Sequence, residues 1–247
     1  MNKCRLGVFL ALFVAACGGN ARADEITVSA AASLKDALTQ IGANYSKAKP
    51  GTKINFNFGS SGTLQRQIEA GAPVDLFVSA SDMNMDALAA GNEIDTSTRR
   101  LLARGELVLV APKDSKLKSI GELRLSGVRS LAVGGPGVPA GDYARQTLKY
   151  LRLSGAVTPK LVLSKDVRSV LAQVAAGNAD AGFVYRTDAL TSKAVRIVAV
   201  APPQSHKPVR YPMAMVKDTA NRSGAIGFLA YLQSSSAKKV LKRFGFR

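Results

Sequence analysis

Segments with the two-residue period of a β-strand alternate along the chain with segments of helical period, and this alternation limits the fold more than any other feature. Strand patterns at 26–30, 53–58 and 76–79 are each followed by a turn and a helix-favouring stretch. Strands that alternate with helices predict a mostly parallel sheet with helices on its faces. The expected fold class is therefore α/β.

The same alternation resumes in the second half of the chain, so we expect two α/β lobes. The expected strands are 26–30, 53–58, 76–79, 107–110, 130–133, 160–163, 181–184 and 209–215. The expected helices are 33–45, 63–70, 83–90, 96–102, 140–151, 167–176, 224–232 and 236–244. Two apolar strand-like segments, 107–110 and 209–215, are suited to carry the chain between lobes. We predict that 24–105 and 210–247 form lobe 1 and that 106–209 forms lobe 2.

Residues 1–23 have the pattern of an export signal. Lys3 and Arg5 precede an apolar run at 7–16, and small residues lead to a cleavage site ending at Ala23. The apolar run is too short to remain as a membrane-spanning helix. We favour cleavage after Ala23, which predicts a periplasmic protein.

Cys4 and Cys17 are the only cysteines, and both lie in this leader. Because residues 14–18 resemble a bacterial lipobox, an alternative is that Cys17 is lipidated and anchors the same folded domain. The body of the chain has no thiol for a disulfide or for thiol chemistry. The only histidine, His206, stands in a loop rich in Pro, Ser and Lys. With one histidine and no cysteine, the body of the chain lacks the residues that a His-based catalytic triad or a zinc site usually needs. We therefore expect no enzyme and no cofactor.

The chain is strongly basic. Its formal net charge is +17, and removal of Lys3, Arg5 and Arg22 with the leader leaves +14. Such an excess attracts anions and speeds their capture. The basic residues are scattered and few aromatic residues lie among them, so we expect no nucleic-acid binding.

Hydroxyl-bearing and small residues stand where predicted strands give way to helices. Ser33 and Ser61 precede or open helices of the first lobe, while Ala140 and Val167 open helices of the second. Helix N-termini offer unpaired N–H groups and the positive end of the helix dipole, and ligands collect at the carboxyl ends of parallel strands. If these helix starts converge, they form an oxyanion site without a contacting Lys or Arg.

Each serine also has an ordinary structural interpretation. Ser33 with Asp36 resembles a loose capping box, and either Ser60 or Ser61 is suited to cap its own helix. Tyr185, taken alone, reads as a partly buried aromatic residue. Only convergence in space makes these residues a site.

Six motifs stand in order along the chain: AAASL at 30–34, FGSSGTL at 58–64, GAPVDLFVSA at 71–80, VPAG at 138–141, DVR at 166–168 and GFVY at 182–185. Together they resemble the periplasmic molybdate-binding proteins of bacterial ABC transporters, over essentially the whole mature chain. The segments GELVLVAP at 105–112 and SHKPVRYP at 205–212 join them. The resemblance implies a two-lobed periplasmic-binding-protein fold, with each lobe built on a mostly parallel sheet flanked by helices and with two hinge crossings.

The resemblance also implies roles for five residues. Ser33 and Ser61 correspond to the two serines that hold the oxyanion in the family, and Tyr185 corresponds to a tyrosine that donates its hydroxyl. Ala140 and Val167 correspond to donors of backbone N–H groups. Molybdenum is then present only as bound molybdate, through the same residues.

One position departs from the family pattern. Some members have three consecutive serines in the second motif, whereas Gly62 takes the third position here. The contacting hydroxyl is therefore either that of Ser61 or that of Ser60.

The function implied is a monomeric extracytoplasmic binding protein that captures molybdate, or tungstate, between its lobes and delivers it to an ABC permease in the inner membrane. Two alternatives remain open at this point. One is a binding protein for another oxyanion such as sulfate. The other is a sensory ligand-binding domain of the same fold, although no DNA-binding helix-turn-helix precedes the domain.

Overall fold

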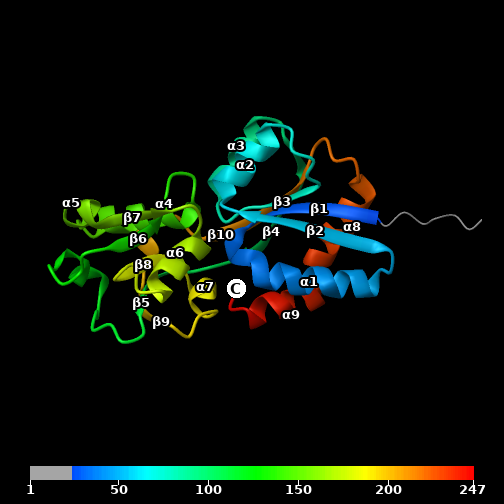
Figure 1. The fold of residues 1–247 in the computed structure, drawn as a ribbon. Coiled ribbons are helices and arrows are strands. Elements are labelled where there is room, and N and C mark those ends of the chain that lie inside the picture. Colours follow the sequence, from blue (N-terminus) through cyan, green and yellow to red (C-terminus); the bar gives the residue numbers. More distant parts are fainter. Residues whose placement is uncertain (1–23) are drawn as a thin grey trace, which may run out of the picture.

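The computed structural model describes residues 24–247, which are arranged in two lobes, each built on a five-stranded sheet (Figure 1). The predicted export signal and the lipobox around Cys17 lie outside the described residues. Among residues 24–247, no helix combines the length and the apolar character needed to cross a membrane.

The sheet of the first lobe has the strand order β2-β1-β3-β10-β4. The strands are β1 (Asp24–Ala31), β2 (Thr52–Gly59), β3 (Leu76–Val78), β4 (Ile94–Arg104) and β10 (Arg210–Val216). β1 is parallel to β2 and β3, whereas β10 is antiparallel to both β3 and β4. Four strands therefore run in one direction, and β10 alone is reversed.

The second lobe repeats this plan with the strand order β7-β6-β8-β5-β9. Its strands are β5 (Leu107–Pro112), β6 (Leu131–Gly134), β7 (Leu161–Ser164), β8 (Ala181–Tyr185) and β9 (Val195–Val200). β6 is parallel to β7 and β8, and β5 is antiparallel to β8 and β9. The reversed strands β5 and β10 are the ones that follow the two crossings between the lobes, and each is an inner strand of its sheet.

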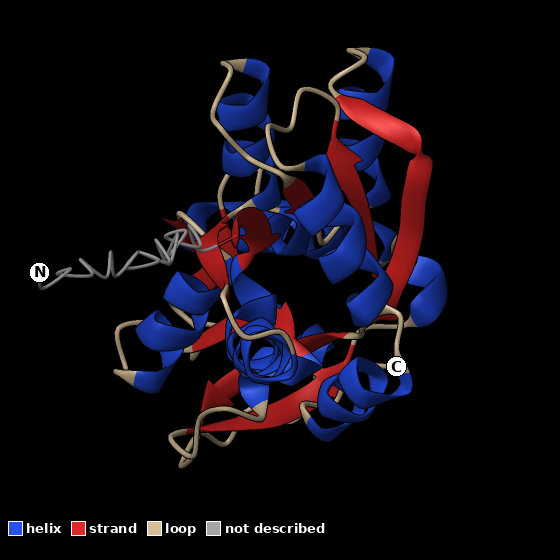
Figure 2. Ribbon diagram, turned by 90° about the vertical axis from the view of Figure 1, so that its right-hand side faces the viewer, coloured by secondary structure: helices blue, strands red, loops and turns tan. Residues whose placement is uncertain are grey.

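Helices cover both faces of the first sheet (Figures 1 and 2). α2 (Ser61–Glu69) and α3 (Asp82–Ala90) lie on one face, and α1 (Lys35–Ala48), α8 (Arg222–Leu232) and α9 (Ser235–Arg243) lie on the other. The second lobe carries α4 (Pro139–Tyr150), α5 (Ser154–Val157), α6 (Val167–Ala175) and α7 (Arg186–Ala189). Short 3-10 turns complete the chain: η1 (Ala32–Leu34), η2 (Ile120–Arg124), η3 (Thr158–Lys160) and η4 (Pro203–Ser205).

The buried apolar residues follow these layers. One cluster, which includes Leu64, Phe77 and Met85, lies beneath α2 and α3. A larger cluster continues from the other face of the first sheet into the second lobe. Because strands β1 and β8 have only buried residues at their carboxyl ends, the ends that meet between the lobes are held rigidly.

The prediction of a helix at 96–102 is wrong, because these residues belong to β4. Thr96 and Thr98 are β-branched, which favours a strand. Pairing with the inner strand β10 decides the structure, and the Thr98 hydroxyl also accepts a hydrogen bond from Met215 N at 3.0 Å. β9 was not predicted. It is a half-buried edge strand whose pattern, VRIVAV, shows no clean alternation.

Candidate functional site

A small cavity is enclosed by residues of both lobes. The empty space between its lining atoms, which includes space open to solvent, is about 210 Å³. All five residues predicted to bind an oxyanion line it, and none of them is more than 4% exposed. The lining consists of Ala31, Ala32, Ser33, Gly59, Ser60, Ser61, Ala80, Val138, Pro139, Ala140, Asp166, Val167 and Tyr185.

Most of this lining stands where a parallel strand ends and a helix or 3-10 turn begins. In the first lobe, β1 leads into η1 with Ser33, and β2 leads into α2 with Ser61. In the second lobe, β6 leads into α4 with Ala140, and β7 leads into α6 with Val167. N–H groups in the first turn of a helix have no acceptor within that helix. The fold therefore directs unpaired donors and positive dipole ends at one small space.

The structure separates the roles of the two adjacent serines. The Ser60 hydroxyl caps α2 by accepting a hydrogen bond from Thr63 N at 3.2 Å, and it donates to Thr63 Oγ1 at 2.9 Å. The Ser61 hydroxyl accepts a hydrogen bond from Ala80 N at 2.9 Å. An oxygen that only accepts keeps its own proton free to donate. This arrangement favours Ser61 over Ser60 as a donor to an anion.

Ser33 is not a helix cap. It lies within η1, and neither η1 nor α1 has a capping hydrogen bond from a side chain. Its hydroxyl instead donates a hydrogen bond of 3.3 Å to the hydroxyl of Tyr211, a residue of β10 that is fully buried. An anion that accepts this proton would take the place of Tyr211 as acceptor. Sequence reasoning missed Tyr211 as a neighbour of the site, although it lies in the segment 205–212 that joins the motifs.

Tyr185 closes the cavity from the second lobe. Its side chain is 1% exposed, and its ring packs edge-on against that of Tyr211 with 5.8 Å between centroids. Within residues 24–247, the Tyr185 hydroxyl has no hydrogen-bond partner. Burial raises the pKa of this phenol well above its usual value. Tyr185 therefore keeps its proton and carries an unused donor at the cavity.

The cavity is lined by neutral donors. Its lining contains no Lys or Arg, and its one carboxylate, Asp166, accepts a hydrogen bond from Ser169 N at 2.7 Å as the N-cap of α6. Hydroxyl and backbone N–H groups bind oxyanions by charge-assisted hydrogen bonds. The arrangement suits a small oxyanion.

The comparison with known families agrees with this geometry. The sequence profile of the family described as "Bacterial extracellular solute-binding protein" matches residues 26–247. The chain belongs to this family. The family description also confirms the prediction of an extracytoplasmic protein.

Within this family, the chain is similar to proteins of molybdate binding and of ABC transport. The molybdate-binding protein ModA of Escherichia coli is 45% identical over 241 residues, which cover 94% of this chain and 93% of the relative. A candidate ABC transporter substrate-binding lipoprotein of Bacillus subtilis, YvgL, is 44% identical over 95% of this chain and 93% of its own length. The solved structure of the Azotobacter vinelandii periplasmic molybdate-binding protein has a TM-score of 0.81 and 26% identity, and covers 90% of this chain and 98% of that one.

These findings confirm the resemblance predicted from the six motifs and the two-lobed periplasmic-binding-protein fold. They also confirm the prediction of a binding protein that is not an enzyme, since the ModA relative is named for binding.

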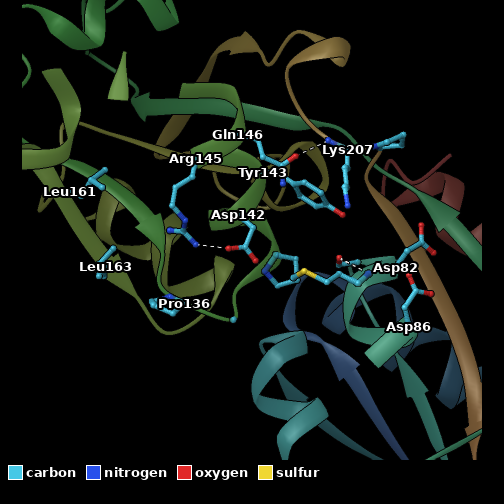
Figure 3. Close-up of a pocket in the computed structure, with 15 residues that line it drawn as sticks. Asp82, Asp86, Pro136, Asp142, Tyr143, Arg145, Gln146, Leu161, Leu163 and Lys207 are labelled. Carbon is cyan, nitrogen blue, oxygen red and sulfur yellow. Dashed lines mark hydrogen bonds and ion pairs between the residues drawn. The ribbon is translucent and has the colours of Figure 1, made fainter. Parts of the chain in front are cut away.

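A wider hollow of this solute-binding protein lies elsewhere between the lobes (Figure 3). It is an open groove with an empty volume of about 1910 Å³, lined from both lobes. Asp82, Asp86 and Asp142 all face it. Arg145 and Lys207 line the groove as well, and Asp142 pairs with Arg145 at 2.6 Å, so its lining has mixed charge. The small cavity, where the predicted donors gather, suits an oxyanion better than this groove.

The two lobes touch beside the cavity. Gly62 N, in the first turn of α2, donates a hydrogen bond of 2.9 Å to the carbonyl oxygen of Gly137 in the second lobe. A Cβ atom on Gly62 would lie 2.5 Å from that oxygen, closer than real contacts allow. Tyr143 adds a second contact, since its hydroxyl lies 3.3 Å from the carbonyl oxygen of Ala80. The glycine that departs from the family pattern is therefore required by the closed arrangement.

Proposed function

We propose that this protein captures molybdate in the cavity between its lobes and delivers it to an ABC permease. The observation that carries the proposal is that five residues chosen from sequence, from both lobes, line one buried cavity that contains no cationic side chain. The identity of 45% to a protein named for molybdate binding supports this choice of oxyanion. Tungstate has the same charge and nearly the same shape, so we expect it to bind as well.

The chemistry of binding follows from the donors. A desolvated dianion is stable only if most of its oxygens accept hydrogen bonds. In the proposal, the hydroxyls of Ser33 and Ser61 donate from the first lobe. The backbone N–H groups of Ala140 and Val167 and the phenol of Tyr185 donate from the second.

Capture proceeds by closure of the lobes. We propose lobe limits of 24–105 with 210–247, and 106–209, because β4 ends and β5 begins around Gly105, and β10 begins at Arg210. An anion that contacts donors of both lobes stabilises the closed form by its differential contacts. The permease then recognises the closed, loaded protein, which acts as a monomer.

Calorimetry on residues 24–247 tests the proposal. Molybdate and tungstate are expected to bind, and sulfate and phosphate to bind more weakly. Stronger binding of sulfate, or no binding of molybdate, would overturn the choice of ligand. Binding is expected to persist in EDTA, since no bridging cation is involved.

A double variant tests the site. Ser33→Ala with Ser61→Ala removes two donors, and each lost hydrogen bond to a charged group costs roughly 1.5–3 kcal/mol of binding free energy. Ser234→Ala is the matched control, because Ser234 caps α9 through Ala237 N and lies outside the cavity. Equal affinity of the double variant and the control would refute the assignment.

The mode of retention outside the cytoplasm is a separate proposal. We infer cleavage after Ala23, with lipidation of Cys17 as the alternative that the Bacillus subtilis relative favours by its name. The intact mass of the exported protein decides between a chain beginning at Asp24 and a lipidated chain beginning at Cys17.

A further inference from the structure

An arginine beside the cavity joins the two lobes. Arg168 is the second residue of α6 and directly follows Val167, which lines the cavity. Its Nη2 lies 2.5 Å from Oδ2 of Asp36, in the first turn of α1. The two residues belong to different lobes, so this ion pair forms only when the lobes are together.

The second lobe holds this guanidinium in position. Arg168 Nε lies 2.7 Å from Oδ1 of Asp188, a carboxyl group that is fully buried. Arg168 Nη1 donates a hydrogen bond of 3.1 Å to the hydroxyl of Thr191. A guanidinium is planar, and two of its three nitrogens contact the second lobe, Nη1 through a hydrogen bond and Nε through an ion pair. The third nitrogen, Nη2, contacts Asp36 of the first lobe.

The contact lies at the elements that carry the proposed anion donors. Asp36 is three residues beyond Ser33, and α6 packs against η1, the turn that contains Ser33. An ion pair between Asp36 and Arg168 therefore ties the first turn of α1 to the first turn of α6. Any separation of these turns moves the Ser33 hydroxyl away from the Val167 N–H.

We propose that Asp36 and Arg168 form a latch across the cleft that keeps Ser33 and Val167 at anion-binding distance, so that both determine affinity without touching the anion. This inference rests on the proposed oxyanion function. Arg168 is a positioning residue, and Asp188 and Thr191 orient it. The Asp36 side chain is 41% exposed and that of Arg168 is 25% exposed, so solvent and salt weaken the latch.

Asp36→Asn tests the latch because it removes one charge and leaves the second-lobe partners of Arg168 intact. The variant is expected to bind molybdate about fivefold more weakly, the upper range for a partly exposed ion pair, mainly through faster dissociation. Asp95→Asn is the matched control, because Asp95 pairs with Arg222 inside the first lobe at 2.8 Å. Unchanged affinity and dissociation rate in Asp36→Asn would overturn the latch.

A second variant checks that the two residues act together. Arg168→Lys keeps the positive charge but loses the planar guanidinium that contacts several acceptors at once. If the latch exists, the double variant Asp36→Asn with Arg168→Lys binds no more weakly than the weaker single variant. Additive losses would overturn the pairing.

A measurement without molybdate separates failure of the latch from failure of the proposed function. Because residues 24–247 contain no cysteine, Glu69→Cys and Ser154→Cys give one exposed spin-label site on each lobe. In ligand-free protein, Asp36→Asn is expected to shift the distance distribution to longer values, and Asp95→Asn is not. If the distance distribution shifts in a protein that does not bind molybdate, the latch is supported and the choice of ligand is refuted. If Asp36→Asn and the unchanged protein have the same distance distribution and the same affinity, the latch is refuted.

Discussion

At the scale of single residues, the hydroxyl of Tyr185 is the most informative group. It is buried and has no partner among residues 24–247, which costs stability unless a ligand accepts its hydrogen bond. Tyr185→Phe is therefore expected to have opposite effects on the free and loaded protein. The free energy of unfolding without ligand rises by about 1 kcal/mol, and the binding free energy of molybdate weakens by roughly 1.5–3 kcal/mol.

Urea unfolding and calorimetry measure these two effects on the same preparation. Tyr231→Phe, on the half-buried face of α8, is a suitable control. If Tyr185→Phe bound molybdate as tightly as the unchanged protein, the phenol would be only a packing group.

Asp188 gives the second prediction at this scale. Burial raises the pKa of its carboxyl to about 7, against the opposing effect of the Arg168 guanidinium. A carboxyl whose pKa is higher in the folded state favours folding when protonated. Its stabilisation is therefore complete below about pH 4 and is lost as the pH rises through 7.

The free energy of unfolding is thus expected to fall between about pH 4 and pH 7, by at most roughly 4 kcal/mol. Asp188→Asn should flatten this slope, while Asp218→Asn, at an exposed position, should not. Urea denaturation at several pH values measures the slope. An equally steep slope in Asp188→Asn would assign the pH dependence to other groups.

Sequence reasoning selected five residues that line one cavity, but it did not predict their hydrogen bonds. Ser33 and Ser61 were recognisable because hydroxyls at helix starts and the family motifs indicated the same positions. The choice between Ser60 and Ser61 depended on Ala80 N, a group from a distant segment. The contact between Ser33 and Tyr211 joins residues 178 positions apart, and no local pattern reports it.

At the scale of elements, the approach of α2 to the loop at Gly137 controls closure. Gly62→Ser places a Cβ where only 2.5 Å is available to a carbonyl oxygen, so the closed form must shift. Overpacking of this kind costs 1–3 kcal/mol, which predicts molybdate binding that is roughly tenfold weaker. The stability of the free protein should change less, because opening relieves the contact.

Calorimetry and thermal unfolding check this prediction. Gly155→Ser is the control, since a Cβ there meets nothing within 4 Å. Affinity that is unchanged in Gly62→Ser would show that the loop at Gly137 moves freely.

The one element that sequence misassigned illustrates the limit of local patterns. Residues 96–102 have apolar spacing compatible with a helix, and their own propensities do not decide the matter. β10 lies between β3 and residues 94–104, and its open backbone groups are satisfied only if that segment is a strand. A partner more than a hundred residues away therefore overrides the local signal.

At the scale of the whole molecule, net charge and cavity chemistry have separate roles. The charge of +14 on residues 24–247 lies outside the cavity lining, which has no Lys or Arg. It is expected to steer anions to the protein and not to hold them. Association of molybdate should therefore slow several-fold as ionic strength rises, while dissociation from the buried cavity stays nearly constant.

Stopped-flow kinetics at low and high salt separate the two rates. A dissociation rate that rises as steeply as the association rate falls would place the attracting charges at the anion itself. The cation-free lining predicts the opposite.

The placement of β10 has a consequence for how the molecule is made. This strand lies inside the first sheet, between β3 and β4, although more than a hundred residues of the second lobe are synthesised before it. A nascent chain therefore cannot complete its first sheet until residue 216 has left the ribosome. Strand pairing over such a sequence separation is slow, so the polypeptide stays unfolded for longer. An unfolded chain is what passage through a narrow export channel requires.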